Sequence, residues 1–186
     1  MPTWVIRLTV PFSAPYQIGN AALAVRTAAE IADRYPVSAD IIGEAVRSTR
    51  WDGRMQEIAP GVFLDGAHNE EGIRAFCTAA SALTGDDGCV LLFGVMADKD
   101  WQSMVHLLAE SLRPRRVILT RPDAGRGMDP EKLAFYFAQA GIRDTECMED
   151  VPSAYKEALL AKGEGILFCA GSLYLIGRIL EFHDQL

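Results

Sequence analysis

The sequence predicts an α/β protein with a Rossmann-like, doubly wound and mostly parallel sheet that carries helices on both faces. Two continuous apolar runs, C-V-L-L-F-G-V over 89–95 and G-I-L-F-C-A over 165–170, are typical of strands buried on both faces. Helical patterns lie between the strand candidates, and such helices are the crossovers that parallel pairing requires. The first fifty residues lack this alternation. We therefore expect two parts, residues 1–50 and residues 51–186, of which the second holds the sheet.

The first part is expected to contain one strand and two helices. V-I-R-L-T-V over 5–10 is a strand candidate, and two prolines in the next segment end it. From Asn20 an Ala-rich stretch with an apolar stripe predicts a helix that Asn20 caps. A second helix is expected over 39–49, after the N-cap residue Ser38. The single strand has no evident partner, so this part is expected to be the stub of something larger.

The second part alternates strands and helices from Arg54 onward. Two short strands are expected on either side of the turn Pro60-Gly61. Further strands are predicted over 89–95, 116–120, 145–148 and 165–170, and helices are predicted to begin at Asn69, Trp101, Asp129, Pro152 and Leu173.

Composition excludes several classes of protein. The net charge of -7 argues against a general polyanion-binding surface, so we expect no nucleic-acid partner. No window approaches the roughly 20 apolar residues of a membrane span, and a soluble, cytoplasmic protein is expected. The four cysteines form no C-x-x-C pair and are expected to be free thiols: Cys77, Cys89, Cys147 and Cys169.

Polar residues follow four of the predicted strands. In open α/β sheets ligands bind beyond the carboxyl ends of the strands, so these junctions are the candidate site. They read L-D-G-A-H-N, F-G-V-M-A-D-K-D, T-R-P-D-A-G-R-G and C-A-G-S-L-Y. Their convergence from separate parts of the sequence predicts one shared cleft.

The first junction has two readings. Asn69 is expected to cap a helix whose first turn holds Glu70 and Glu71, as the helix dipole prefers. Asp65 and His68, three positions apart, could ligate a metal, but no third ligand is nearby. We therefore expect no metal site in this chain.

The other junctions also leave alternatives open. Lys99 is either a solvated loop charge or a point charge that holds a carboxylate or phosphate. Ser172 is expected to cap the last helix, and its hydroxyl and the free N–H groups behind it can also receive an anion. Arg121 and Arg126 flank a Gly-containing loop and either face solvent or contact a substrate.

Several catalytic motifs are missing from the sequence. It contains no G-x-x-x-x-G-K-[ST] P-loop, no G-x-G-x-x-G after a first strand and no G-x-S-x-G nucleophile turn. No cysteine has an evident histidine partner. The junctions are typical of nucleotide binding, but the motif that cradles phosphates is not in the chain.

Five ordered blocks add a family resemblance: P-Y-Q-I-G-N-A-A-L-A (15–24), W-D-G-R-M-Q-E-I (51–58), G-V-F-L-D-G-A-H-N (61–69), L-L-F-G-V-M-A-D-K-D-W (91–101) and A-G-S-L-Y-L-I-G (170–177). They resemble the C-terminal part of folylpolyglutamate synthase / dihydrofolate synthase, in the Mur ligase superfamily of ATP-dependent ligases. The family's N-terminal ATPase domain has no counterpart here. The resemblance makes residues 1–50 a linker stub with helices that join that domain, and residues 51–186 the C-terminal glutamate-ligase domain.

The resemblance implies a reaction and a set of residues. A folate or dihydropteroate carboxylate is phosphorylated from ATP, and L-glutamate then attacks the acyl phosphate. ATP and Mg²⁺ are the implied cofactors, with the magnesium ligands and the P-loop in the N-terminal ATPase domain, the implied partner. The implied roles are ATP contacts for Asn20, Arg54 and Asp65, a catalytic position at the interdomain cleft for His68, and glutamate contacts for Lys99 and Ser172.

These roles suit the chemistry of the side chains. Asn20 offers a donor and an acceptor to a base edge, Arg54 neutralises phosphate charge, and Asp65 accepts from ribose hydroxyls. Without the ATPase domain the chain is expected to be inactive.

Three other functions compete with this interpretation. A stand-alone Rossmann-like binding or regulatory module would explain the absent P-loop. A metal-dependent hydrolase would use Asp65 and His68. A peptidoglycan-precursor ligase shares the superfamily, but W-D-G-R-M-Q-E and F-G-V-M-A-D-K-D favour the folate branch.

Overall fold

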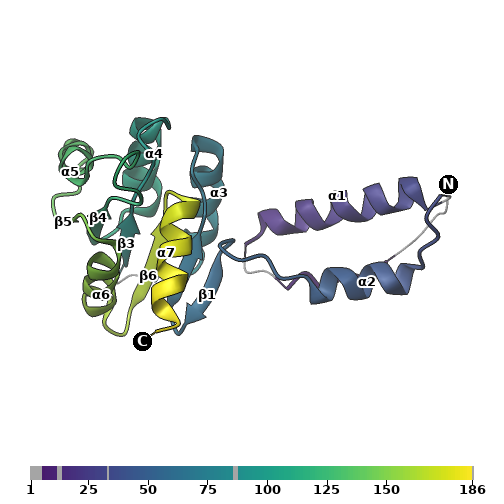
Figure 1. Ribbon diagram of the computed structural model, residues 1–186. Helices are drawn as coiled ribbons and strands as arrows, with labels where there is room; N and C mark the ends of the chain where they lie inside the picture. The colour runs from purple at the N-terminus through teal and green to yellow at the C-terminus, as the bar shows by residue number, and fades with distance from the viewer. Residues whose placement is uncertain (1–5, 12–13, 33, 86–87, 186) are drawn as a thin grey trace. The chain divides into compact units, whose positions relative to one another are not determined.

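The chain divides into two compact units. The computed structural model describes residues 6–11, 14–32, 34–85 and 88–185. Contacts between residues group Met1–Asp52 into one unit and Gly53–Leu186 into the other. The first unit is helical and the second contains the sheet (Figure 1).

The helical unit consists of α1 (Tyr16–Ile31) and α2 (Ala39–Ser48). Ser38 caps α2 as predicted, because its hydroxyl oxygen accepts a hydrogen bond from the Ile41 amide. The predicted cap at Asn20 is wrong. α1 begins four residues earlier, after Pro15, whose φ of −57° already suits a first helical turn. Asn20 lies inside the helix, where its Nδ2 donates to Gln17 Oε1 over 2.7 Å.

The predicted strand over 5–10 is not formed in its described part. Ile6–Val10 lies in neither a helix nor a strand, and Val5 falls outside the described residues. A strand needs a neighbour for its backbone N–H and C=O groups, and the described elements of this unit are both helices. High β propensity alone therefore did not produce a strand.

The second unit is built on a six-stranded sheet, and the predicted fold class is confirmed. Its strands are β1 (Gln56–Ala59), β2 (Val62–Asp65), β3 (Cys89–Phe93), β4 (Arg116–Thr120), β5 (Thr145–Met148) and β6 (Ile166–Ala170), in the order β1-β2-β6-β3-β4-β5. Every neighbouring pair is parallel except β1 and β2, which form an antiparallel hairpin. The hairpin turns at Pro60-Gly61, where Gly61 has a φ of +70°, as predicted from the Pro-Gly pair.

The helices of this unit begin close to their predicted starts. They are α3 (Glu70–Ser81), α4 (Trp101–Leu107) with its π-helical continuation η1 (Leu108–Leu112), α5 (Pro130–Gln139), α6 (Val151–Lys162) and α7 (Leu173–His183). The side chain before each of the five α-helices accepts a hydrogen bond from a backbone amide of the first turn. These caps are Asn69, Asp100, Asp129, Asp150 and Ser172.

Two apolar layers hold the helices to the sheet. Alternate strand residues, including Leu64, Leu92 and Cys169, form one core cluster with side chains of α6 and α7. The strand residues between them point to the opposite face of the sheet. There the ring centroids of Phe168 and of Phe76 in α3 lie 5.6 Å apart. Both faces of the central strands are therefore buried, which explains their continuous apolar runs.

The sheet changes the side of its crossovers at β6. α3, α4 and α5 cover one face, whereas α6 and α7 cover the other (Figure 1). β6 lies between β2 and β3, so the chain leaves β6 toward one face and leaves both of its neighbours toward the opposite face. Such a switch point opens a crevice at the carboxyl ends of these strands.

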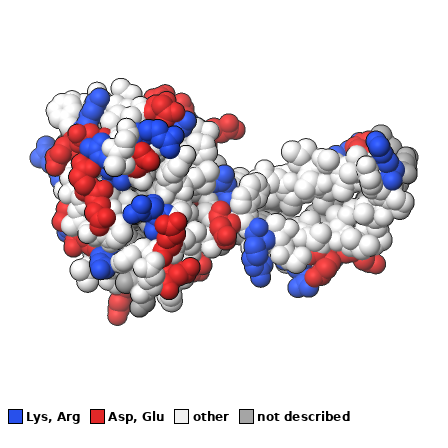
Figure 2. All heavy atoms as spheres, in the orientation of Figure 1, with Lys and Arg blue, Asp and Glu red and all other residues white. Residues whose placement is uncertain are grey.

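Charges of both signs are interspersed on the surface of the sheet unit that faces the viewer in Figure 2. Lysine and arginine side chains lie among aspartates and glutamates there, and no extended basic surface forms on that face. This arrangement agrees with the acidic balance of the sequence.

We predict that Gly171→Ala lowers the free energy of unfolding by about 2 kcal/mol or more. Gly171 has a φ of +114°, and a Cβ there would lie 2.6 Å from the Gly94 carbonyl oxygen. The matched control is Gly177→Ala in α7, where a Cβ meets no atom within 4 Å. The control should be neutral or up to about 1 kcal/mol more stable in urea denaturation. Equal stabilities of the two variants would contradict the prediction.

Candidate functional site

Asp65 ends β2 and connects two loops at the carboxyl edge of the sheet. Its side chain is only 2% exposed. Oδ1 accepts from the Ala67 amide over 2.9 Å, and Oδ2 accepts from the Met55 amide over 3.0 Å. The carboxylate therefore fastens the loop before β1 to the turn after β2.

Arg54 lies in the loop that Asp65 fastens. The Gly66 amide donates to the Gly53 carbonyl oxygen over 2.7 Å, and Arg54 Nη1 donates to the same oxygen over 3.2 Å. A Cβ placed on Gly66 would come within 2.9 Å of Arg54 Nη1. The half-buried guanidinium thus packs against the backbone of the D-G-A-H-N turn.

His68 lies one residue before the cap of α3. Its Nδ1 is 2.8 Å from the Gly66 carbonyl oxygen, and because that oxygen only accepts, Nδ1 carries the proton of this hydrogen bond. In the neutral ring Nε2 is then the acceptor. Its side chain is half-buried at the crevice.

The turn after β6 is joined to both neighbouring junctions. The Gly171 amide donates to the Ala67 carbonyl oxygen over 3.0 Å, and the Gly94 amide donates to the Ala170 carbonyl oxygen over 3.3 Å. Ser172 is 1% exposed and its Oγ accepts from the Tyr174 amide over 3.1 Å. Ser172 therefore fixes the first turn of α7 beside the D-G-A-H-N turn.

Lys99 lies in the loop after β3. Its Nζ is 3.1 Å from Asp98 Oδ2, and this hydrogen bond lowers the pKa of the exposed Asp98 carboxyl. The Lys99 side chain is 37% exposed, so its ammonium is open to a ligand as well as to Asp98.

Arg126 connects the loop after β4 to its neighbours. Its carbonyl oxygen accepts from the Ala97 amide over 2.8 Å, and its guanidinium stacks 5.0 Å from the centre of the Tyr174 ring. The structure thus brings the loops after β3 and β4 together with the start of α7.

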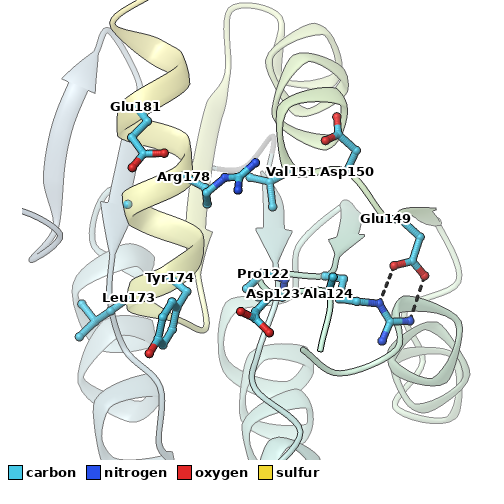
Figure 3. A pocket seen from close by; sticks show the side chains of 12 residues that line it. Pro122, Asp123, Ala124, Glu149, Asp150, Val151, Leu173, Tyr174, Arg178 and Glu181 are labelled. Atoms are coloured by element: carbon cyan, nitrogen blue, oxygen red, sulfur yellow. Dashed lines mark hydrogen bonds and ion pairs between the residues drawn. The ribbon is translucent and has the colours of Figure 1, made fainter. Parts of the chain in front are cut away.

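A cavity of about 640 Å³ lies between the loop after β4, the start of α6 and one face of α7 (Figure 3). It is lined by Arg121, Pro122, Asp123, Ala124, Glu149, Asp150, Val151, Leu173, Tyr174, Gly177, Arg178 and Glu181. Two arginines and four carboxylates are among these residues, so the cavity wall carries charges of both signs.

Arg121 is a wall of this cavity rather than a solvated loop charge. Its Nη2 donates to Glu149 Oε1 over 3.0 Å and its Nη1 donates to the Gly127 carbonyl oxygen over 3.0 Å. The hydrogen bond to Glu149 raises the pKa of Arg121 and lowers that of Glu149. Arg121 therefore ties the loop after β4 to Glu149 in the loop after β5.

Arg178 differs from Arg121. It extends from α7 toward Val151, the first residue of α6 (Figure 3). Within the described residues its guanidinium makes no hydrogen bond or ion pair. Sequence reasoning missed it because a charged residue in a helix is usually a solvated one. The signal that could have found it is the spacing of four residues from Tyr174, which puts both on one face of α7.

The chain offers neither a metal site nor a cysteine nucleophile in its described part. No group of three or more His, Cys, Asp or Glu side chains among the described residues could hold a metal ion. All four cysteines are free, and burial raises the pKa of Cys77 to about 12 and that of Cys89 to about 11. Such thiols stay protonated at neutral pH and are poor nucleophiles.

Residues 53–173 match the family model described as Mur ligase, glutamate ligase domain. The chain belongs to this family. The predicted resemblance is confirmed.

Two curated relatives are named for folate enzymes. The chain is 32% identical over 172 residues to a probable bifunctional folylpolyglutamate synthase/dihydropteroate synthase of Haloferax volcanii. This alignment covers 91% of our chain and 20% of that protein. It is 33% identical over 182 residues to the folylpolyglutamate synthase of Lacticaseibacillus casei, covering 94% of the chain and 40% of that protein. The chain thus spans less than half of the length of either relative.

A solved structure has the same fold. The folylpolyglutamate synthase of Mycobacterium tuberculosis, complexed with ADP, superimposes with a TM-score of 0.81 at 22% identity. The match covers 94% of this chain and 41% of that one. No helix in the described ranges of our chain is long and apolar enough to cross a membrane.

We predict that Asn69→Ala lowers the free energy of unfolding by about 1 kcal/mol. Asn69 Oδ1 accepts from the Gly72 amide over 2.8 Å and is the side-chain cap of α3. Asn69→Asp keeps an acceptor and should remain within a few tenths of a kcal/mol of the parent chain. Chemical denaturation measures both, and an alanine variant as stable as the aspartate variant would disprove the capping role.

Proposed function

We propose that the chain is the C-terminal domain of an ATP-dependent ligase that adds L-glutamate to folate or dihydropteroate through an acyl phosphate. The observation that carries this proposal is the match of residues 53–173 to the glutamate ligase domain, together with relatives named for folate enzymes. The crevice at β6 supplies the corresponding surface, because four loops with polar side chains meet there.

The nucleotide side of the crevice is assigned to Arg54 and Asp65 of the sheet unit, and Asn20 of the helical unit is separately assigned the ATP contact that the family resemblance implies. The Arg54 guanidinium is held at the strand ends by the Gly53 and Gly66 backbones, where it can neutralise phosphate charge. Asn20 is exposed on α1 and presents an amide that can pair with a base edge. These residue types fit ATP.

Magnesium is assigned to the partner domain. The described residues of this chain contain no carboxylate and histidine group that could hold the ion. We place the magnesium ligands and the phosphate-cradling loop in an N-terminal ATPase domain, as the family resemblance implies.

The catalytic position is assigned to His68. Its Nδ1–H bond to the Gly66 carbonyl oxygen leaves Nε2 as a hydrogen-bond acceptor at the crevice. There the ring can order the closed state or accept a proton from the attacking amine. Closure against the ATPase domain would exclude the water that hydrolyses an acyl phosphate.

The glutamate side is assigned to Lys99, Ser172 and the cavity along α7. Lys99 supplies a partly exposed ammonium for a carboxylate. Ser172 is buried and serves by fixing the turn that carries Leu173 and Tyr174 into the cavity wall. Arg178 adds an exposed guanidinium to the cavity wall, and its charge helps to lower the pKa of the Asp150 carboxyl.

The direct test is an assay with and without the ATPase domain. We expect no glutamate-dependent phosphate release from the purified 186-residue chain, because half of the transition-state contacts are absent. When the chain follows an N-terminal ATPase domain, phosphate release should require both glutamate and a folate or dihydropteroate. Ligation by the chain alone, or none by the joined protein, would refute the proposal.

Arg178→Gln in the joined ligase should raise the KM for glutamate by about tenfold and leave the KM for ATP unchanged, because a charge-assisted hydrogen bond contributes about 1.5–3 kcal/mol. The control is Arg143→Gln, an exposed arginine before β5 at the opposite edge of the sheet. Steady-state kinetics separate the two substrates. An unchanged KM for glutamate, or equal effects of both variants, would remove Arg178 from the site.

A further inference from the structure

The cavity along α7 carries an unpaired cation on one turn of the helix and an unpaired anion on the next turn. We infer that Arg178 and Glu181 together set the length of the amino acid that the cavity accepts. Arg178 binds the side-chain carboxylate of L-glutamate, and Glu181 repels the carboxylate of a longer homologue. The inference rests on the proposed function, and it adds Glu181 to the glutamate site as a residue that determines specificity.

The order of side chains along α7 follows from helix geometry. A spacing of three residues puts Arg178 and Glu181 on one face of the helix, where both line the cavity. Tyr174 also lines the cavity and lies in the first turn of α7, at the carboxyl edge of the sheet. With a rise of about 1.5 Å per residue, Arg178 lies about 6 Å along the helix from Tyr174, and Glu181 lies about 10 Å from it. The three side chains therefore line the cavity in this order from the carboxyl edge inward (Figure 3).

Both of these charges are available to a ligand. The side chains of Arg178 and Glu181 are exposed, and within the described residues they form no ion pair or hydrogen bond, either with each other or with a third group. Arg121, the other arginine of the cavity wall, is by contrast bound to Glu149. Among the described lining residues, Arg178 therefore has the guanidinium that is free to hold a ligand carboxylate by two parallel hydrogen bonds.

The cavity wall is acidic beyond Arg178. Hydrogen bonds from Ser153 and, to a smaller extent, the charge of Arg178 lower the pKa of the Asp150 carboxyl, which caps α6. Glu181 adds a second carboxylate, one turn further along α7 than Arg178. Figure 3 shows Asp150 and Glu181 on the far side of Arg178 from Tyr174. A ligand carboxylate that passes Arg178 would therefore meet two anions.

This arrangement distinguishes acidic amino acids by their length. When the amine of the ligand lies at the crevice, the side chain of glutamate extends along α7 and its carboxylate binds Arg178. Aspartate is one methylene shorter, so its carboxylate stops before the guanidinium. L-2-aminoadipate is one methylene longer, and its carboxylate is pushed toward Glu181 and Asp150, where like charges repel it. The cavity thus combines an attractive contact for glutamate with a repulsive contact against its longer homologue.

The test measures kcat/KM for L-glutamate and for L-2-aminoadipate in the ligase joined to its ATPase domain. In Glu181→Gln we expect kcat/KM to rise about tenfold for L-2-aminoadipate and about twofold for glutamate, because the longer ligand lies closer to the removed charge. Glu181→Lys should favour L-2-aminoadipate further, since it replaces a repelling charge by an attracting one. The matched control is Glu164→Gln, an exposed glutamate between α6 and β6 and outside the cavity wall, which should leave the ratio of the two kcat/KM values unchanged.

Ionic strength supplies a readout that a purely structural role of Glu181 would not move. The repulsion acts between partly exposed charges, so salt screens it. Raising the salt concentration from about 0.05 M to about 0.5 M should reduce the preference of the parent ligase for glutamate over L-2-aminoadipate. The same change should affect the preference of Glu181→Gln much less, because the charge nearest to the longer ligand is gone.

The outcomes separate this inference from the proposed function. An unchanged preference in Glu181→Gln, or equal changes in Glu181→Gln and Glu164→Gln, would overturn the inference while the joined ligase still adds glutamate. A preference of the parent ligase that does not depend on salt would do the same. A joined ligase that releases no phosphate in the presence of glutamate would overturn the proposed function, and the inference with it.

Discussion

β6 is the last strand of the sequence, yet it pairs with β2 on one side and β3 on the other at the centre of the sheet. Its five residues accept and donate backbone hydrogen bonds on both edges, and four of them are fully buried. The loop after β6 then reaches both neighbouring loops through the amides of Gly171 and Gly94. Without this insertion the Asp65 turn and the Lys99 loop would lie on adjacent strands with helices on the same face, and no crevice would open between them.

Much of this unit could be predicted because its signals are local. Asn69 and Ser172 cap helices where their side chains suggested, and the Pro60-Gly61 pair turns the hairpin. The failures came where context outweighs propensity. Among the described residues of its unit the apolar run over 6–10 has no strand to pair with, and α1 begins after Pro15, ahead of the better capping residue Asn20. The central place of β6 is a long-range fact that spacing along the chain does not contain.

In the candidate site, too, the positions of residues along the chain could be predicted, whereas features that depend on tertiary packing could not. Asp65, His68 and Ser172 come together because each lies at or just after the carboxyl end of β2 or β6, and the sequence predicts that such ends meet at one edge of a parallel sheet. The burial of these side chains could not be predicted from the sequence. Asp65 and Ser172 are almost fully enclosed, which changes what their oxygens can touch. Arg178 could not be predicted as a site residue, because only the packing of α7 against α6 shows which face of α7 borders the cavity.

All five α-helices of the sheet unit within the described residues follow a parallel strand, so all of them start at the carboxyl edge. Each backbone dipole has its positive end there, and five such ends share one rim. Three of these ends are capped by the carboxylates of Asp100, Asp129 and Asp150, and α3 carries Glu70 and Glu71 in its first turn, so acidic side chains of the chain itself lie at four of the five positive ends. α7 differs, because its cap is the neutral Ser172 and its first turn has no acidic residue. The positive end of the α7 dipole is therefore the one that no cap or first-turn carboxylate of its own helix matches.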